Sequence, residues 1–156
     1  MKIKGINPSL KAHQEDAVNK ALKSDNGLIL AHSVGSGKTL TSMAIANAIG
    51  KPVDVVVPAS LIDNYKTQIE NHTNKDSVQI RIYSLQDVTI HPEKLIRGDS
   101  IWSNKPEDEI VPIKDRVLVV DEAHRIRNEK SKAYNTIKES PYSKKILLTG
   151  TPIYNN

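Results

Sequence analysis

Cysteine and phenylalanine are absent from the 156-residue sequence, and tryptophan occurs once. Without cysteine the chain can form neither a disulfide bond nor a thiolate metal site. Aromatic residues make up only 4% of the chain, and Trp102 and the five tyrosines are scattered, so we predict no platform on which nucleic-acid bases would stack. The five histidines show no ligand spacing, and we therefore predict no zinc site.

The sequence also lacks any apolar run near the roughly 18 residues that a membrane-spanning helix requires. Residues 1–8 contain neither the apolar segment nor the small-residue cleavage site of a secretory signal. We therefore expect no membrane partner and an intracellular location, which would be the cytoplasm, the nucleus of a eukaryote, or a host cell if the gene is viral or from a phage.

The composition is that of a globular domain, with 38% hydrophobic and 26% charged residues. There is no internal repeat, low-complexity tract or Gly/Ser linker, so we expect one domain over residues 1–156. The 22 basic and 18 acidic residues give a net charge of +4. This charge permits a nucleic-acid partner, but an ordinary solvated surface explains it equally well.

Short apolar runs alternate with segments of helical periodicity along the chain. Uniformly apolar runs favour strands that are buried on both faces of a parallel sheet. We predict strands at 28–31, 53–57, 78–83, 117–120 and 146–148, and helices at 9–24, 39–49, 61–71 and 131–139. The strands are too far apart for hairpins, so the expected fold is an α/β domain with a mainly parallel sheet and helices on both faces.

Local signals place the ends of several helices. Ser9 and Ser60 are expected to cap the first and third helices, and Gly50 is expected to close the second. The polar segment 84–115, which contains three prolines, is predicted to be an irregular excursion with at most one short helix.

A loop rich in glycine and serine lies between the first predicted strand and the helix that follows it. In such a loop backbone N–H groups can surround phosphate oxygens, and the helix N-terminus adds partial positive charge. Lys38 can reach the β- and γ-phosphates of a nucleotide, and the Thr39 hydroxyl can ligate Mg²⁺. His32 departs from the usual phosphate-loop pattern, which has glycine at that position, and the alternative is a flexible turn. The predicted nucleotide-binding residues of this loop are His32, Ser33, Val34, Gly35, Ser36, Gly37, Lys38 and Thr39.

Two carboxylates, Asp121 and Glu122, directly follow the most apolar predicted strand. Ligands of parallel α/β sheets bind at the carboxyl ends of the strands, so these side chains should lie beside the phosphate loop. We expect Asp121 to hold Mg²⁺, directly or through water, and Glu122 to orient and deprotonate a water molecule. A solvated strand terminus is the alternative for an isolated pair of this kind.

Several segments together resemble the first RecA-like domain of superfamily 2 helicases, in particular of Swi/Snf-type DNA translocases. The segment Asp121-Glu122-Ala123-His124 is followed by basic residues, and the segment 147–153 contains Thr-Gly-Thr-Pro. The segments 10–14 and 56–61 resemble two further motifs of that family. The resemblance covers nearly the whole chain and implies a RecA-like P-loop fold.

The resemblance also implies roles for individual residues. Gln14 would read adenine, although glutamine is an ordinary polar-face residue in most helices. The residues that would couple ATP hydrolysis to movement are His124, Thr149 and Thr151. Those that would contact DNA through its backbone are Pro58, Ser60, Arg125 and Arg127. For Ser60 a helix cap, and for the two arginines a charged exposed loop, are the alternatives.

We therefore expect an ATP- and Mg²⁺-binding motor domain whose partners are DNA, preferably double-stranded, and a second RecA-like domain. No segment of the chain resembles that second domain, which in the family supplies arginines to the site, so the chain alone should bind ATP and DNA weakly and hydrolyse ATP slowly. Three interpretations remain open. In the first, the chain is part of a two-domain translocase. In the second, it is a short module that holds ATP or DNA without turnover, and in the third it is a one-domain NTPase that completes its site in an oligomer.

Overall fold

The computed structural model describes residues 1–25, 27–31, 37–106, 110–126 and 131–149, with only the backbone of 27–31. The α-helices of these residues are α1 (Ala12–Lys23), α2 (Lys38–Ile49), α3 (Ile62–His72), α4 (Leu85–Ile90), α5 (Glu93–Arg97) and α6 (Lys132–Glu139). The strands are β1 (Gly27–Ala31), β2 (Val53–Val57), β3 (Ile80–Ser84), β4 (Trp102–Ser103), β5 (Val117–Val120) and β6 (Lys144–Thr149). Short 3₁₀ turns are η1 (Ala59–Leu61), η2 (Ile113–Asp115) and η3 (Ala123–Arg125). No helix of these residues is both long and apolar enough to cross a membrane.

The strands form one sheet in the order β1-β6-β5-β2-β3-β4. Neighbouring strands from β1 to β3 are parallel, and only the two-residue edge strand β4 runs antiparallel. The prediction of a mainly parallel sheet is confirmed. The carboxyl ends of β1, β6, β5 and β2 consequently lie at the same edge of the sheet, as in other parallel α/β sheets.

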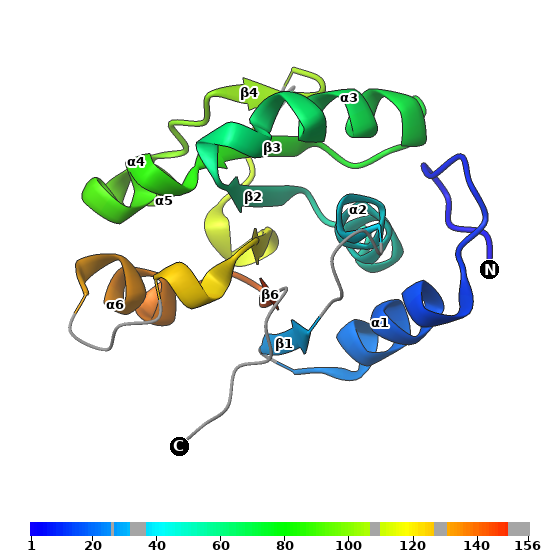
Figure 1. Ribbon diagram of the computed structural model, residues 1–156, viewed down its shortest axis with the longest axis horizontal. Helices are drawn as coiled ribbons and strands as arrows, with labels where there is room; N and C mark the ends of the chain where they lie inside the picture. The colour runs from blue at the N-terminus through cyan, green and yellow to red at the C-terminus, as the bar shows by residue number, and fades with distance from the viewer. Residues whose placement is uncertain (26, 32–36, 107–109, 127–130, 150–156) are drawn as a thin grey trace.

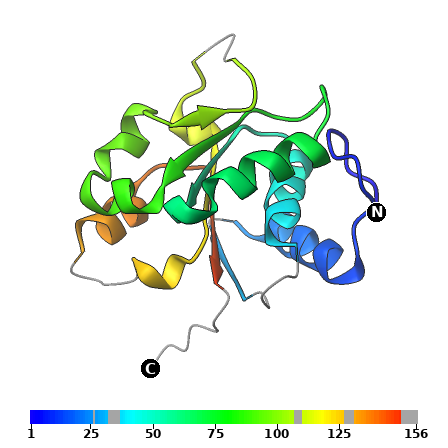
Figure 2. The same cartoon turned by 45° about the horizontal axis from the view of Figure 1, so that its top comes forward.

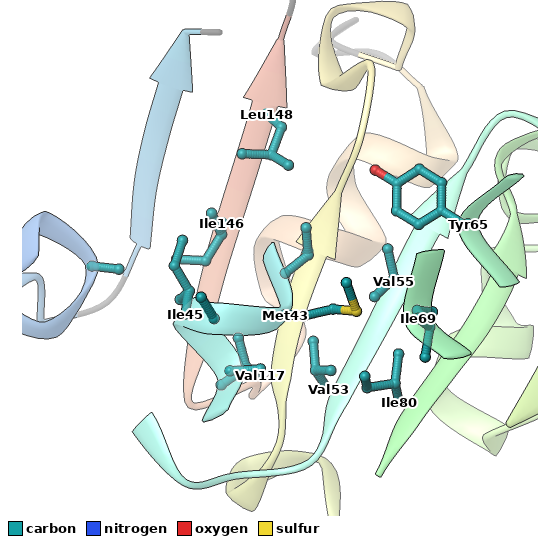
Figure 3. Packing of buried hydrophobic residues seen from close by; sticks show 14 of the residues in the cluster. Met43, Ile45, Val53, Val55, Tyr65, Ile69, Ile80, Val117, Ile146 and Leu148 are labelled. Carbon is teal, nitrogen blue, oxygen red and sulfur yellow. The ribbon is translucent and has the colours of Figure 1, made fainter. Parts of the chain in front are cut away.

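Helices cover both faces of the sheet, as predicted (Figures 1 and 2). Side chains alternate between the two faces along a strand, so Val53, Val55 and Val57 of β2 pack with α1, α2 and α3, whereas Val56 packs with α4 and α6. Figure 3 shows the first of these apolar layers, in which Met43 of α2 lies over the strands. Because both faces are covered, all four residues of β5 are buried and uniformly apolar.

Two of the predicted helix caps are wrong. Helix α1 begins at Ala12, after Lys11 rather than Ser9, and the Lys11 N–H donates to the Gln14 side-chain carbonyl at 2.9 Å. Helix α3 begins after Leu61 without a capping side chain, because residues 59–61 first form the tighter turn η1 and leave Ser60 too early in the chain to cap the helix. Gly50 does close α2, with a φ of 80°.

Residues 84–115 are more regular than predicted. They contain α4, α5, β4 and η2, and the hydroxyl of Ser84 caps α4 by accepting from the N–H of Asp87 at 3.2 Å. Leu85, Val88 and Leu95 are buried in the second apolar layer. Helices of six and five residues are too short to establish a periodicity in the sequence, and the prolines that separate them favoured the irregular interpretation.

A buried charge network lies inside the sheet and was not predicted. Asp54 of β2 is fully buried, and it accepts from Arg81 Nε at 2.7 Å and from Arg116 Nη2 at 2.9 Å. The Tyr142 hydroxyl donates to the same carboxylate at 2.7 Å, and burial together with the charge of Asp54 raises the pKa of Tyr142. Asp54 and Arg81 are register partners on the parallel strands β2 and β3. Arg116 comes just before β5 and Tyr142 just before β6, so the network joins β2 and β3 to the starts of these two strands.

Candidate nucleotide site

The N-terminus of α2 lies at the carboxyl edge of the sheet. Gly37 precedes the helix with a φ of 76°, in the left-handed region that favours glycine. Lys38 and Thr39 form the first turn of α2, where backbone N–H groups lack partners within the helix and attract anions. The predicted loop residues His32, Ser33, Val34, Gly35 and Ser36 lie outside the described residues.

Lys38 contacts both carboxylates predicted for the site. Its Nζ lies 3.2 Å from Asp121 Oδ1 and 3.2 Å from Glu122 Oε1, although these residues are 83 and 84 positions further along the chain. Burial acts to lower the pKa of Lys38, but the charges and hydrogen bonds of the two carboxylates outweigh it and raise the pKa above its usual value. The lysine is therefore held as a cation between two anions.

Asp121 is buried, and described groups donate to both of its oxygens. Oδ1 accepts from Lys38 and from the Glu122 N–H at 2.9 Å, and Oδ2 accepts from the Tyr65 hydroxyl at 2.9 Å. Glu122 has a φ of 56°, which makes it the one residue other than glycine with a positive φ in the described part of the chain. A left-handed conformation costs roughly 1–2 kcal/mol at such a residue, and strain of this kind is typical of functional sites.

Two of the residues predicted for coupling lie in contact. Nδ1 of His124 is 3.1 Å from the Thr149 hydroxyl, and Nε2 is 3.3 Å from Glu122 Oε2. His124 thus connects the end of β6 with the acidic turn after β5. The third predicted coupling residue, Thr151, lies outside the described residues.

Gln14 is buried and lies against the start of α2. A Cβ atom added to Gly37 would come within 2.7 Å of Gln14 Nε2, so the two residues are in close contact. The structure therefore brings the residue predicted to read adenine beside the described end of the phosphate loop.

Replacing Gly37 with alanine should destabilise the chain and weaken the ATP binding that the sequence predicts. The positive φ alone costs an alanine roughly 1–2 kcal/mol, and the added methyl group would displace Gln14. Gly50→Ala is the matched control, because its φ is 80° and no atom lies within 4 Å of an added Cβ. Denaturant unfolding should show a larger loss for Gly37→Ala, and calorimetric titration with ATP should show weaker binding for that variant alone. Equal losses of stability and unchanged ATP affinity in both variants would contradict the proposed contact.

The described residues that are predicted to contact DNA follow two neighbouring strands, β2 and β5. Pro58 follows β2 and is buried, Ser60 is exposed in η1, and Arg125 is exposed at the end of η3 after β5. All three are therefore on the carboxyl side of the sheet. Arg127 lies outside the described residues.

The side chains at the site have the chemistry that Mg²⁺ requires. Asp121 and Glu122 offer carboxylate oxygens, and Thr39 offers a hydroxyl in the first turn of α2. Magnesium prefers such oxygen ligands and is commonly held by one or two carboxylates together with substrate phosphates. Across the described residues no group of three or more His, Asp or Glu side chains could hold a metal ion. The donor set thus fits an ion that a nucleotide would share.

Comparison with known proteins identifies the family. Residues 13–156 match the SNF2-related domain. The chain belongs to this family. The resemblance seen in the sequence is thereby confirmed, and the chain is a Swi/Snf-type RecA-like domain of superfamily 2.

Individual relatives support this assignment. This chain is 32% identical over 162 residues to the mouse SWI/SNF-related matrix-associated actin-dependent regulator of chromatin subfamily A member 1. The match covers 85% of this chain and 14% of the mouse protein. The chain is 29% identical to the uncharacterized ATP-dependent helicase YqhH of Bacillus subtilis, covering 92% of this chain and 26% of that one. The SWI2/SNF2 ATPase core of Sulfolobus solfataricus, solved with double-stranded DNA, has a similar structure, with a TM-score of 0.68 at 21% sequence identity. The match covers 97% of this chain and 34% of that chain, and it confirms the RecA-like fold. The chain thus spans about a third or less of each of these proteins.

Two features of the structure, one at the site and one away from it, were not predicted. Tyr65 contacts Asp121, and its position in the pattern Ile62, Tyr65, Ile69 along α3 predicts burial, where a tyrosine hydroxyl needs a partner. The buried network around Asp54 was signalled by a charged residue within the apolar run of β2. The sequence did not show which residues would meet it.

Proposed function

We propose that this SNF2-related domain binds ATP with Mg²⁺ at the start of α2 and hydrolyses it when a second RecA-like domain completes the site. The contact of Lys38 with both Asp121 and Glu122 carries this proposal, because it unites the two halves of an NTPase site from distant parts of the chain. The ATP-dependent helicase among its relatives supports the choice of nucleotide.

Each side chain has a role that follows from its position. The N-terminus of α2 and Lys38 would bind the β- and γ-phosphates, and the close contact between Gln14 and Gly37 would place the amide near the base. Thr39 and Asp121 would hold Mg²⁺, which neutralises charge on the transferred phosphoryl group. Glu122 would orient the attacking water and accept its proton.

We propose double-stranded DNA as the macromolecular partner, bound through its backbone. The Sulfolobus solfataricus ATPase core was solved with double-stranded DNA, and Ser60 and Arg125 of this chain are exposed after strands that end at the same edge of the sheet. Pro58, which is buried, and Arg127, which lies outside the described residues, are proposed from the sequence alone. His124 would couple the nucleotide site to movement, since it joins Glu122 to Thr149; Thr151, two residues further on, would share that role.

The 156-residue chain alone should hydrolyse ATP slowly or undetectably, with and without DNA. An arginine supplied by a second domain is typically worth about 10³–10⁵ in rate, and we propose that the partner domain supplies it here. Steady-state phosphate release with and without double-stranded DNA tests this expectation.

Robust DNA-stimulated turnover by the monomer would contradict it. Turnover that appears only at high protein concentration, together with an ATP-dependent increase in sedimentation coefficient, would instead show that a second copy completes the site. Binding of ATP or DNA without turnover, even after a partner domain is added, would favour a module that only binds.

A further inference from the structure

We propose that Tyr65 is a positioning residue that holds Asp121, a proposed magnesium ligand, in place before nucleotide and metal bind. This proposal rests on the proposed function and assigns a role to a side chain outside the phosphate loop and the acidic turn. Tyr65 belongs to α3, which otherwise contributes apolar side chains to the core.

The hydroxyl of Tyr65 contacts one of the candidate magnesium ligands. It donates to Asp121 Oδ2 at 2.9 Å. A tyrosine hydroxyl has one proton to donate, and this contact uses it. Figure 3 shows the ring among the buried side chains, with its hydroxyl directed toward β5.

Burial makes this arrangement rigid. Tyr65 is only 4% exposed, and its ring is packed in the apolar layer that contains Ile69 and Val55. The hydroxyl donates its proton to Asp121 Oδ2 from this fixed position. The aspartate therefore has a fixed neutral donor on one oxygen.

The two oxygens of Asp121 have different partners. Oδ1 contacts the Lys38 ammonium, a long side chain that can turn toward phosphates when a nucleotide binds. Oδ2 accepts from the hydroxyl of Tyr65, whose buried ring does not move with the lysine. When Lys38 leaves, Tyr65 and the Glu122 N–H still fix the plane of the carboxylate. Groups that orient metal ligands in this way commonly affect metal affinity about 10- to 100-fold.

Tyr65→Phe tests the role, because it removes the hydroxyl and leaves the ring and the core volume unchanged. The matched control is Tyr142→Phe, which removes a hydroxyl that donates at 2.7 Å to another buried aspartate, Asp54, away from the site. The probe is Mn²⁺, titrated into the 156-residue chain with saturating ADP and followed by electron paramagnetic resonance. ADP affinity is also measured in EDTA.

The expected result is a roughly tenfold weaker Mn²⁺ affinity for Tyr65→Phe and an unchanged affinity for Tyr142→Phe. ADP affinity in EDTA should be the same in both variants and the wild type, because the hydroxyl acts only on the proposed metal ligand Asp121. Both variants should lose some thermal stability. Because Tyr142→Phe loses stability as well, a general weakening of the fold would lower Mn²⁺ affinity in that variant too.

Mn²⁺ affinity that falls equally in the two variants, or in neither, would overturn the role of Tyr65 while leaving the nucleotide site intact. A Tyr65→Phe variant that loses ADP affinity equally with metal and in EDTA would overturn it as well, since the residue would then act on the whole site. A wild-type chain that binds neither ADP nor Mn²⁺ would overturn the proposed function itself, and the inference with it.

Discussion

Asp54→Asn should lower the free energy of unfolding by about 3–5 kcal/mol, the cost of leaving buried charges without their counterion. The carboxylate accepts from Arg81, Arg116 and Tyr142, and both Asp54 and Arg116 are fully buried. An asparagine has one acceptor oxygen and no charge, so two guanidinium groups would lose their anion in the interior of the sheet. For a domain of this length the loss corresponds to a fall of about 10 °C in the melting temperature.

Asp63→Asn is the matched control for this prediction. The Asp63 side chain is fully exposed, and its carboxylate lies 4.0 Å from Lys66 on the surface of α3. Solvent screens an exposed ion pair of this kind, so Asp63→Asn should unfold at nearly the same urea concentration as the wild type. Urea unfolding followed by circular dichroism measures both variants. A loss below 1 kcal/mol for Asp54→Asn would show that the network contributes little to stability.

Lys38→Ala should weaken ATP binding about ten- to hundredfold, since a charged hydrogen bond contributes about 1.5–3 kcal/mol and the lysine is proposed to contact two phosphates. Lys51→Ala is the matched control, because Lys51 lies just beyond the other end of α2 and donates to the Ser143 hydroxyl at 2.8 Å. Calorimetric titration with ATP and Mg²⁺ measures both. Equal affinities in the two variants would contradict the role of Lys38.

The position of the candidate site was predictable where chemistry and chain order coincide. A phosphate loop is expected between a strand and a helix, and carboxylates for a metal are expected after a buried strand, so Lys38 and Asp121 were predicted to lie close together. The parallel sheet then follows from the alternation of strands and helices, and it brings the two residues into contact. The structure also places Gln14 against Gly37, a contact that no local pattern implies.

The features that were missed depend on contacts between distant segments. Asp54 contacts Arg81, Arg116 and Tyr142 because β2 has β3 and β5 as neighbours in the sheet. The local sequence around each of these residues does not indicate which partner it will have. Tyr65 reads as an ordinary core position of α3 until the end of β5 is placed beside it. The boundary errors at Ser9 and Ser60 have a local cause, since a hydroxyl residue near a helix start caps it only when the first turn begins directly after it.

The most direct test of the nucleotide site is a two-dimensional NMR titration of the ¹⁵N-labelled chain with ADP and Mg²⁺. The account predicts that the amide signals that shift belong to the first turn of α2, the acidic turn after β5, and Gln14, with Lys38 and Glu122 among the largest changes. Signals that stay in place at these residues, or that shift only around the opposite edge of the sheet, would contradict a nucleotide site formed by Lys38, Asp121 and Glu122.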